Sequence, residues 1–372
     1  MKCAFPLLHN WLQDAYPEAT VSGTVVLSAF TTKLAVYALA RGYAGTELLV
    51  PIGAAMTAFP IFFAVIENDL RRVLAYSLNN QLGFMVVGIG IGTELSLNGT
   101  AAHAFSHILY KALLFMSMGA VLYRVGTAKG SELGGLYKSM PWTTGFCIVG
   151  AASISAFPLF SGFISKALII SAAMYEGYFW TWMVLVFASA GVFHHSGIKV
   201  PFFAFFAHDS GKRCEEAPAN MLVAMALAAA LCIGLGVYPD PLYAILPYAV
   251  DYEPYTGSHV LTQLQLLMFS ALAFSVLMRT GIYPPELRAV NLDFDWSYRF
   301  LLSRIVGVAG KAIGGAISGA ESGGAGLWAR IEARARALHG PGGYFGRTWA
   351  SGAMGLGVML MLLAFLVSYY VF

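Results

Sequence analysis

The chain has 372 residues, of which 58% are hydrophobic and only 11% are charged, with a formal net charge of +3. Soluble domains carry about 25% charged residues, so this composition excludes an ordinary soluble enzyme. It predicts an all-α membrane protein with many spans, because a helix of about 20 apolar residues crosses the bilayer.

Nine stretches are long and apolar enough to be predicted as membrane spans. In chain order they cover residues 21–41, 47–66, 73–93, 98–123, 143–176, 178–205, 219–238, 261–281 and 349–371. The fifth is too long for one straight helix and contains the run FPLFSG. Pro158 cannot donate a backbone hydrogen bond and Gly162 is flexible, so we expect a broken helix at 157–162.

Lysine and arginine are divided unequally between alternate loops, and this division predicts the orientation of the spans. The loops at 66–72, 124–142, 206–218 and 279–348 hold most of these cations, whereas the opposite loops hold only Arg41. Under the positive-inside rule, the basic loops face the cytoplasm. The excess positive charge is thus explained by topology, and we expect no nucleic acid as a partner.

The fourth predicted span carries His103, His107 and Lys111 at intervals of four residues. Each step of four rotates by only about 40°, so the three side chains share one helix face. A charged lysine near the bilayer centre costs roughly 2.5–3.5 kcal/mol, so such a stripe is expected to face a protein interior or a wet cavity. Groups that gain and lose protons can relay them there, which predicts a proton or ion translocator.

Three further cations lie inside predicted spans, and all three are lysine rather than arginine. A buried lysine can become neutral whereas arginine stays charged, so a proton carrier has to be lysine or histidine. We expect Lys33 and Lys166 to be relay residues. For Lys199 the alternative is snorkelling to the interface. Of the adjacent His194 and His195, at most one can join the same row, and an interhelical hydrogen bond is the alternative.

Carboxylates and cofactor motifs are missing from the predicted spans. No Asp or Glu lies in the middle of any of them, so the acidic partner that usually tunes a lysine relay is not supplied at mid-depth. The four cysteines show no metal-ligand spacing, and the three that lie in or beside apolar segments are expected to be buried, inert thiols. No dinucleotide-binding glycine pattern, Fe–S cysteine set or haem-ligand pair is visible, so we predict no cofactor, no metal and no catalytic residue.

Four motifs in a fixed order resemble one superfamily. They are ENDLRRVLAYSLNNQLGF (67–84), HAFSHILYKALLFMSMGAVLYR (103–124), LGGLYKSMP (133–141) and FPLFSGFISKALI (157–169). The chain from residue 1 to about 240 is similar to the antiporter-like proteins. These are the D and A subunits of Mrp-type multisubunit Na+/H+ antiporters and the L, M and N subunits of respiratory complex I.

The resemblance implies two inverted five-helix repeats, each with a broken helix, joined by a central polar axis of lysine and histidine. This chain would hold one complete repeat and a remnant of the other. The first half, with its glutamate, is expected in a longer gene product or, alternatively, in a separate polypeptide. Lys2 matches the lysine of the first broken helix. The predicted relay set is therefore Lys33, His103, His107, Lys111 and Lys166, with Lys2, His195 and Lys199 as possible members.

Beyond residue 240 the resemblance weakens. Residues 296–337 are glycine-rich and basic, and the run ESGGAG interrupts them at 321–326. This pattern predicts two helices that lie on the cytoplasmic face and are attracted to anionic lipid. The alternative is a solvated linker. The predicted organisation is a broken-helix remnant and loop (1–20), a proton-translocating transmembrane domain (21–240), a further span and loop (241–282), an amphipathic cytoplasmic-face segment (283–348) and a C-terminal span (349–372).

These features predict a D-like proton-translocating subunit of a multisubunit antiporter in the bacterial inner membrane, which exchanges H+ for Na+ or another monovalent cation. Protons would enter from the cytoplasm, pass along Lys33, His107 or His103, and Lys111, and leave through Lys166 toward the outside, or they would run the reverse way. One alternative is a non-catalytic membrane subunit of an NADH:quinone oxidoreductase of the complex I type. A second is a translocation-inactive scaffold. The expected partners are other subunits, membrane lipid and a polypeptide that supplies the missing half.

Overall fold

The computed structural model describes residues 1–288 and 291–371, apart from the side chains of 316, 318–325 and 371. Apart from one isolated bridge between Asp69 and Lys129, the regular secondary structure of the described residues is helical. The chain divides into two compact units, Met1–Asp295 and Trp296–Phe372, and each has its own set of helices.

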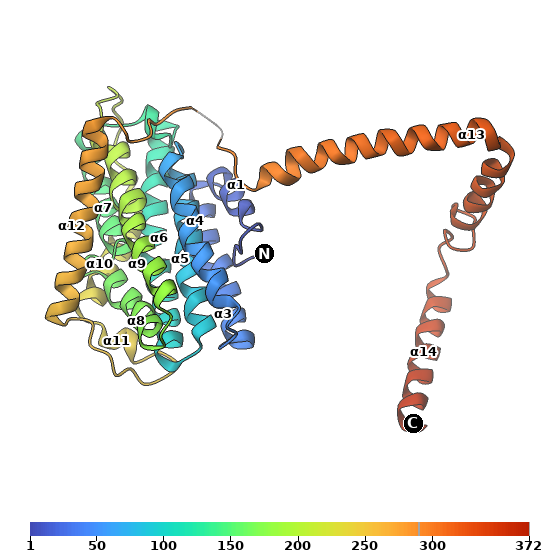
Figure 1. The fold of residues 1–372 in the computed structure, drawn as a ribbon, viewed down its shortest axis with the longest axis horizontal. Helices are drawn as coiled ribbons and strands as arrows, with labels where there is room; N and C mark the ends of the chain where they lie inside the picture. Colours follow the sequence, from blue (N-terminus) through green and yellow to red (C-terminus); the bar gives the residue numbers. More distant parts are fainter. Residues whose placement is uncertain (289–290, 372) are drawn as a thin grey trace. The chain divides into compact units, whose positions relative to one another are not determined.

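The first unit is a helical bundle (Figure 1). Its α-helices, in chain order, are α1 (Asn10–Glu18), α2 (Val21–Val26), α3 (Thr32–Tyr43), α4 (Leu49–Ile66), α5 (Leu70–Ile91), α6 (Glu94–Val125), α7 (Pro141–Ile154), α8 (Ser161–Tyr175), α9 (Phe179–Val192), α10 (Ala219–Val237), α11 (Asp240–Tyr243) and α12 (Gly257–Thr280).

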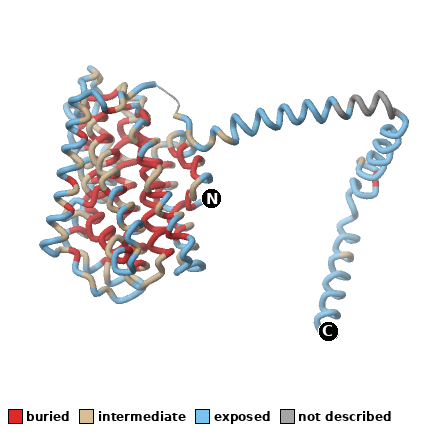
Figure 2. Tube along the Cα trace, viewed as in Figure 1, coloured by how far each residue is buried: buried red, intermediate tan, exposed pale blue. Residues whose placement is uncertain are grey.

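Helix α5 is an interior helix of this bundle. It is buried without interruption from Val73 to Gly90 and packs against α1, α3, α4, α6 and α8, and the interior of the bundle is the buried part of the molecule in Figure 2. It nevertheless carries Asn79, Asn80 and Gln81, whose polar groups lipid cannot solvate. The neighbouring helices therefore have to cover a polar segment, and the candidate site forms along it.

Helices α4 and α5 pack closely through glycine. A Cβ atom added at Gly83 would lie 2.6 Å from the carbonyl oxygen of Gly53, and one added at Gly53 would lie 2.6 Å from the amide nitrogen of Val87. Small residues at such contacts let helix backbones approach each other inside membranes. A larger side chain at either glycine would force the two helices apart.

The helix break predicted at 157–162 is present. Helix α7 ends at Ile154, α8 begins at Ser161, and the chain between them is irregular. Ala156 and Leu159 have φ values of 58° and 73°, which non-glycine residues rarely adopt. The last carbonyls of α7 are therefore left without partners in their own helix, available to other donors.

The same irregular backbone occurs a second time. The tetrapeptide AFPL begins at Ala4 and again at Ala156, whose φ values are 57° and 58°. The leucines that end it, Leu7 and Leu159, have φ values of 71° and 73°. The opening of the chain thus repeats the backbone conformation of the central break at these two positions.

Two predicted spans contain π-helical turns. The span 21–41 is interrupted by η1 (Leu27–Thr31), and the span 178–205 continues from α9 into η4 (Phe193–Lys199) and, after a short gap, η5 (Phe202–Phe206). π-Helical turns are rare and occur frequently at functional sites. Here Lys33 follows the first of them, and His195 and Lys199 lie in the second.

Seven helices among the described residues are long and apolar enough to cross a membrane. They are Val21–Tyr43, Leu49–Ile66, Glu94–Val125, Phe179–Phe206, Ala219–Val237, Gly257–Thr280 and Ser351–Tyr370. The other two predicted spans are not among these seven. Helix α5 carries several polar residues that other helices cover, and the stretch 143–176 is divided into α7 and α8, each shorter than a full span.

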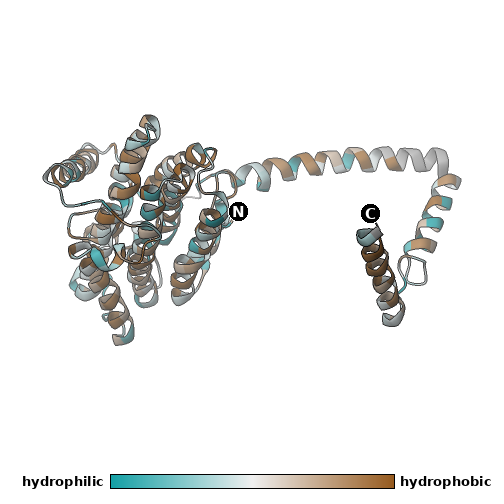
Figure 3. Ribbon diagram, turned by 90° about the horizontal axis from the view of Figure 1, so that it is seen from below, coloured by the Kyte–Doolittle hydropathy of each residue, from teal (hydrophilic) through white to brown (hydrophobic). Residues whose placement is uncertain are grey.

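The second unit contains a π-helical turn, η6 (Ser297–Leu302), followed by α13 (Ser303–His339) and α14 (Ser351–Val371). The prediction of two helices in 296–337 is wrong, because α13 runs through the glycines as one element. Each glycine costs only about 1 kcal/mol of helix propensity, which is too little to end a helix. Helix α14 is apolar through its middle and more polar at its ends (Figure 3), as is typical of a membrane span.

Candidate functional site

The stripe on α6 forms the centre of a buried polar row. His103, His107 and Lys111 are all fully buried, as their spacing on one face predicts. The Nδ1 atom of His103 lies 3.1 Å from Ser165 Oγ of α8, and its Nε2 atom lies 3.4 Å from the Tyr110 hydroxyl. The rings of His103 and His107 are 6.2 Å apart. The row therefore reaches from α6 to the residue just before Lys166.

A hydrogen-bonded branch on α5 joins this row. The Tyr110 hydroxyl donates to Gln81 Oε1 at 3.2 Å, and Gln81 Nε2 donates to Asn80 Oδ1 at 2.6 Å. The Asn80 amide in turn donates to the carbonyl of Thr57 on α4. Sequence analysis missed these residues, although three consecutive amides in a buried helix are a usable signal of a polar interior.

His107 and Lys111 have no hydrogen-bond partner in the described part of the chain. This holds for both ring nitrogens of His107 and for the ammonium nitrogen of Lys111, which lies 5.9 Å from the centre of the Phe115 ring. A buried polar group without a partner is costly, so water or a change of protonation state has to stabilise it.

Lys33 lies at the other side of the row, beside the first π-helical turn. Its Nζ atom donates to the carbonyl of Ser28 in η1 at 2.6 Å and lies 3.4 Å from Thr32 Oγ1. Lys33 interacts electrostatically with both His107 and Lys111. The π-helical turn thus supplies the carbonyl that binds the Lys33 ammonium. Lys33 is also close enough to the α6 stripe to interact with its charges.

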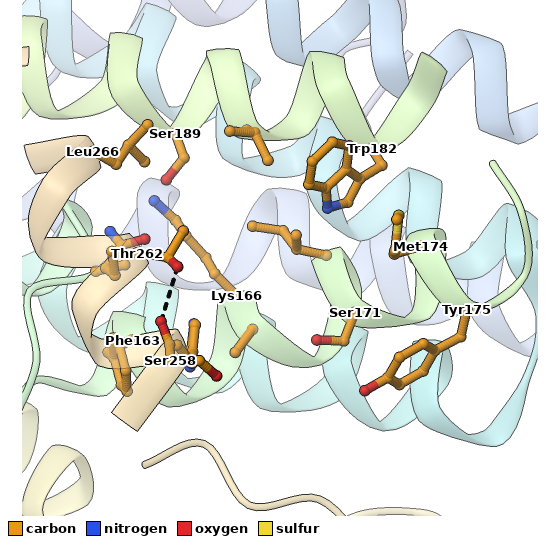
Figure 4. Close-up of a pocket in the computed structure, with 16 residues that line it drawn as sticks. Phe163, Lys166, Ser171, Met174, Tyr175, Trp182, Ser189, Ser258, Thr262 and Leu266 are labelled. Carbon is orange, nitrogen blue, oxygen red and sulfur yellow. Dashed lines mark hydrogen bonds between the residues drawn. The ribbon is translucent and has the colours of Figure 1, made fainter. Parts of the chain in front are cut away.

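Lys166 connects the row to a cavity. It is buried, its Nζ atom donates at 2.6 Å to the carbonyl of Ile154, the last residue of α7, and it lies 5.5 Å from the centre of the Phe84 ring. The break in the helix supplies that carbonyl. Figure 4 shows the Lys166 side chain between Ser189 of α9 and Thr262 of α12, inside a cavity of about 320 Å³.

Lys199 is held very differently. Its side chain is 0% exposed, so the snorkelling alternative is wrong for this structure. The Nζ atom donates to the carbonyls of Ala64, Val65 and Glu67 at 3.2, 2.7 and 2.6 Å, at the C-terminal end of α4. It also lies 2.9 Å from Glu286 Oε1. Lys199 therefore caps a helix end and forms a buried ion pair.

Two carboxylates reach the bundle from outside the spans, in the connector that follows α12 (residues 281–288 and 291–295). Glu286 pairs with Lys199, and burial raises the pKa of Glu286 although the lysine opposes this shift. Asp293 accepts hydrogen bonds from His9 at 2.9 Å and Tyr76 at 3.0 Å. Burial by itself would raise the pKa of Asp293, but the hydrogen bonds, first of all the one from His9, keep this pKa below its ordinary value. The acidic partner that the spans lack is thus supplied, for Lys199, by the connector.

Only one of the adjacent histidines faces the interior, as predicted. His195 is fully buried, with Nδ1 2.9 Å from Ser196 Oγ, which donates to Ser77 Oγ of α5 at 2.7 Å. His194 is half-buried and stacks on Tyr283, with ring centres 5.5 Å apart. His195 also interacts electrostatically with Lys111, Lys199 and Lys166.

Lys2 and Arg71 do not join the row. Lys2 is exposed. Arg71 is buried, but its guanidinium donates to the carbonyls of Pro17 and Ala19 at 2.7 and 2.8 Å, which ties the end of α1 and the residue after it to α5. These bonds give Arg71 a structural role.

Residues 1–193, which contain most of the buried row, match the family described as "NADH:quinone oxidoreductase/Mrp antiporter, TM". The chain belongs to this family. It is 31% identical over 254 residues to the D subunit of the Na(+)/H(+) antiporter of Alkalihalophilus pseudofirmus, a match that covers 64% of this chain and 50% of the relative. Hydrogenase-4 component B of Escherichia coli is 28% identical, with 61% and 39% covered. This family member thus spans about half the length of these relatives or less.

Two solved structures share the fold of this family member. The Mrp complex from Dietzia sp. contains a chain with a TM-score of 0.60 and 21% identity, covering 76% of this chain and 59% of the other. The membrane-bound sulfane sulfur reductase, an archaeal respiratory membrane complex, contains one with a TM-score of 0.60 and 27% identity, covering 73% and 55%. Together with the apolar helices, the family membership makes this chain a multi-pass integral membrane protein.

Proposed function

We propose that this chain is a D-like proton-translocating subunit of a multisubunit monovalent cation/proton antiporter in the bacterial inner membrane. The observation that carries the proposal is the buried row of Lys33, His103, His107, Lys111 and Lys166. No member of the row pairs with a carboxylate among the described residues. Only a few groups of such a row can be protonated at the same time, because like charges repel strongly in a low-dielectric interior.

The contacts suggest an order for proton transfer. Lys33 interacts with His107, the ring of His107 neighbours that of His103, and His103 bonds to Ser165, next to Lys166. Each proton that arrives at one group lowers the proton affinity of the next, so a proton is released at the far end. Lys111 interacts electrostatically with both Lys33 and Lys166, so it completes the row on the same buried face of α6.

The exchanged cation is proposed from the relative that is named as part of a Na(+)/H(+) antiporter, and Na+ is the first candidate. The row itself offers only basic and neutral side chains, whereas Na+ needs oxygen ligands and benefits from negative charge. We therefore assign proton transfer to this chain and cation transfer to other subunits of the assembly, including the part that the longer relatives contain.

A second candidate is supported by relatives from redox enzymes. NADH-ubiquinone oxidoreductase chain 5 of Dictyostelium citrinum is 28% identical over 77% of this chain, and the L subunit of the F(420)H(2) dehydrogenase of Methanosarcina mazei is 32% identical over 62% of it. In such an assembly this chain would move protons along the same row, without a catalytic role, and electron transfer in other subunits would drive it.

Everted membrane vesicles from cells that contain the complete assembly would test both candidates. A pH-sensitive dye reports proton movement after addition of Na+, Li+ or K+, or after addition of a reduced electron donor. We expect a cation to drive proton movement that Lys166→Met abolishes, with unchanged amounts of assembly in the membrane. Lys166-dependent proton movement driven only by the electron donor would favour the redox-driven pump. Proton movement that is independent of Lys166 would favour the scaffold.

A further inference from the structure

The cavity that contains Lys166 extends along a large part of α8. Its lining includes α8 residues from Phe163 to Tyr175, the last residue of that helix, together with residues of α9 and the first turns of α12. The C-terminal end of α8 and the N-terminal end of α12 both join loops that the positive-inside rule places outside the cytoplasm. The cavity therefore extends from a buried lysine toward the predicted outer side of the membrane.

The polar groups of the cavity suit water and protons better than a metal cation. A volume of about 320 Å³ holds on the order of ten water molecules at about 30 Å³ each. Ser189 Oγ has no protein partner in the described ranges, and Ser171 Oγ lies 3.0 Å from the Tyr252 hydroxyl. No carboxylate occurs among the described residues that line the cavity. A Na+ ion would thus meet a lysine and no anion, whereas water would find several partners.

A second proton-accepting side chain lines the same cavity. His259, in the first turn of α12, stacks on Phe163 of α8 with ring centres 4.4 Å apart. Its Nδ1 atom lies 2.7 Å from the carbonyl of Pro254. A carbonyl can only accept, so Nδ1 carries the hydrogen and Nε2 is the proton acceptor of the neutral ring. Histidine is the residue type that changes charge near neutral pH.

We propose that this cavity is the aqueous outlet of Lys166 and that His259 accepts the released proton and passes it to the outer solvent. The Lys166 ammonium loses a proton to cavity water, and His259 Nε2 takes up a proton from that water. The imidazolium then returns to neutral by losing a proton to outer solvent. The titratable groups around the cavity are Lys166, Tyr175, Tyr252, Tyr255 and His259. This inference rests on the proposed proton transport.

Cysteine labelling tests whether the cavity is wet. Thr262→Cys places a thiol in the cavity, and Leu261→Cys is a control at the same depth, because Leu261 is the preceding residue of α12, is exposed, and is not among the described residues that line the cavity. A membrane-impermeant, positively charged thiol reagent is added outside right-side-out vesicles that contain the complete assembly. We expect Thr262→Cys to react at least about tenfold faster than Leu261→Cys. Unmodified protein serves as the background for the four native cysteines.

Variants of His259 test its role as proton acceptor. His259→Ala should slow proton release at least about tenfold, and imidazole added outside should restore most of it, because a free base can replace a missing one. His259→Phe keeps an aromatic ring against Phe163 and should be slow but not restored by imidazole. A purely structural role predicts the opposite pattern, with Phe active and Ala beyond rescue.

Equal labelling of the two cysteines, or wild-type proton release by His259→Ala, would overturn the outlet. In that case Lys166-dependent transport by the unmodified assembly would still support the proposed function. Loss of that transport in the unmodified assembly would overturn the proposed function instead, and the labelling would still report whether the cavity holds water.

Discussion

Lys166 and Lys199 are both buried lysines at irregular helices, yet their ammonium groups have very different surroundings. Lys166 donates to one carbonyl and faces a cavity, whereas Lys199 faces three carbonyls and the carboxylate of Glu286. Burial alone therefore does not identify a proton carrier. A carrier must be stable with its proton and without it, so the number of acceptors around it matters as much as its depth.

The four acceptors at Lys199 oppose the loss of its proton. A neutral amine has two hydrogens and would leave at least two of the four acceptors unmet, at about 1–3 kcal/mol for each buried group. At Lys166 a neutral amine can still donate to the carbonyl of Ile154 and bond to water. We therefore propose that Lys199, predicted as a possible relay residue, is a permanently charged structural group.

The largest effect is expected from arginine at these two positions. Lys166→Arg should reduce proton transport at least about 100-fold, because arginine cannot release a proton. Lys199→Arg keeps the positive charge and the donors, so it should retain most of the transport activity. Dye-monitored proton movement in everted vesicles measures both rates. Equal loss in the two variants would remove the distinction between carrier and structural lysine.

Removal of the Lys199 side chain should affect stability more than transport chemistry. Lys199→Met leaves Glu286 as a buried, unpaired charge and should destabilise the protein by about 3–5 kcal/mol. Lys138→Met breaks the exposed pair with Asp209 and should cost at most about 1 kcal/mol. Heat-induced aggregation of the purified assembly compares the two. A stability loss at Lys199 no larger than that at Lys138 would contradict the buried ion pair.

A smaller effect is expected at the contact between the row and Lys166. Ser165→Ala removes the hydroxyl beside His103 and should slow proton transport by roughly two- to tenfold, which corresponds to a hydrogen bond of about 0.5–1.5 kcal/mol. Ser117→Ala is the control, because that buried hydroxyl donates to a carbonyl of its own helix and lies outside the row. Transport rates equal to wild type in both variants would separate His103 from the path.

The smallest effect concerns the connector and acid pH. The pKa of Asp293 lies below its ordinary value of 3.8, so ionised Asp293 stabilises the docked connector above that value, and this stabilisation is lost as the pH falls through the lowered pKa. We expect hydrogen exchange of residues 291–295 to become faster on acidification, by an amount that corresponds to a loss of at most about 1 kcal/mol in the free energy that holds the connector in place. Asp293→Asn should remove this pH dependence; its persistence in that variant would assign the effect to another group.

Local pattern was enough to predict several parts of this molecule. The apolar runs predicted the spans, Pro158 predicted the broken helix, and the spacing of His103, His107 and Lys111 predicted one buried face. These properties depend on residues within a few helical turns of one another, which the sequence records directly. The glycines of α13 misled the prediction because a weak helix former lowers propensity without ending the helix.

The amino-acid sequence by itself thus determined that this is a helical membrane protein in which His103, His107 and Lys111 share one buried face. Only the tertiary structure decided which basic side chains have partners. Ser165 of α8 reaches His103 of α6, and Glu286 reaches Lys199 from the connector that follows α12. Hydrogen bonds and ion pairs between residues far apart in the chain leave no local periodicity, because their geometry exists only after the helices pack.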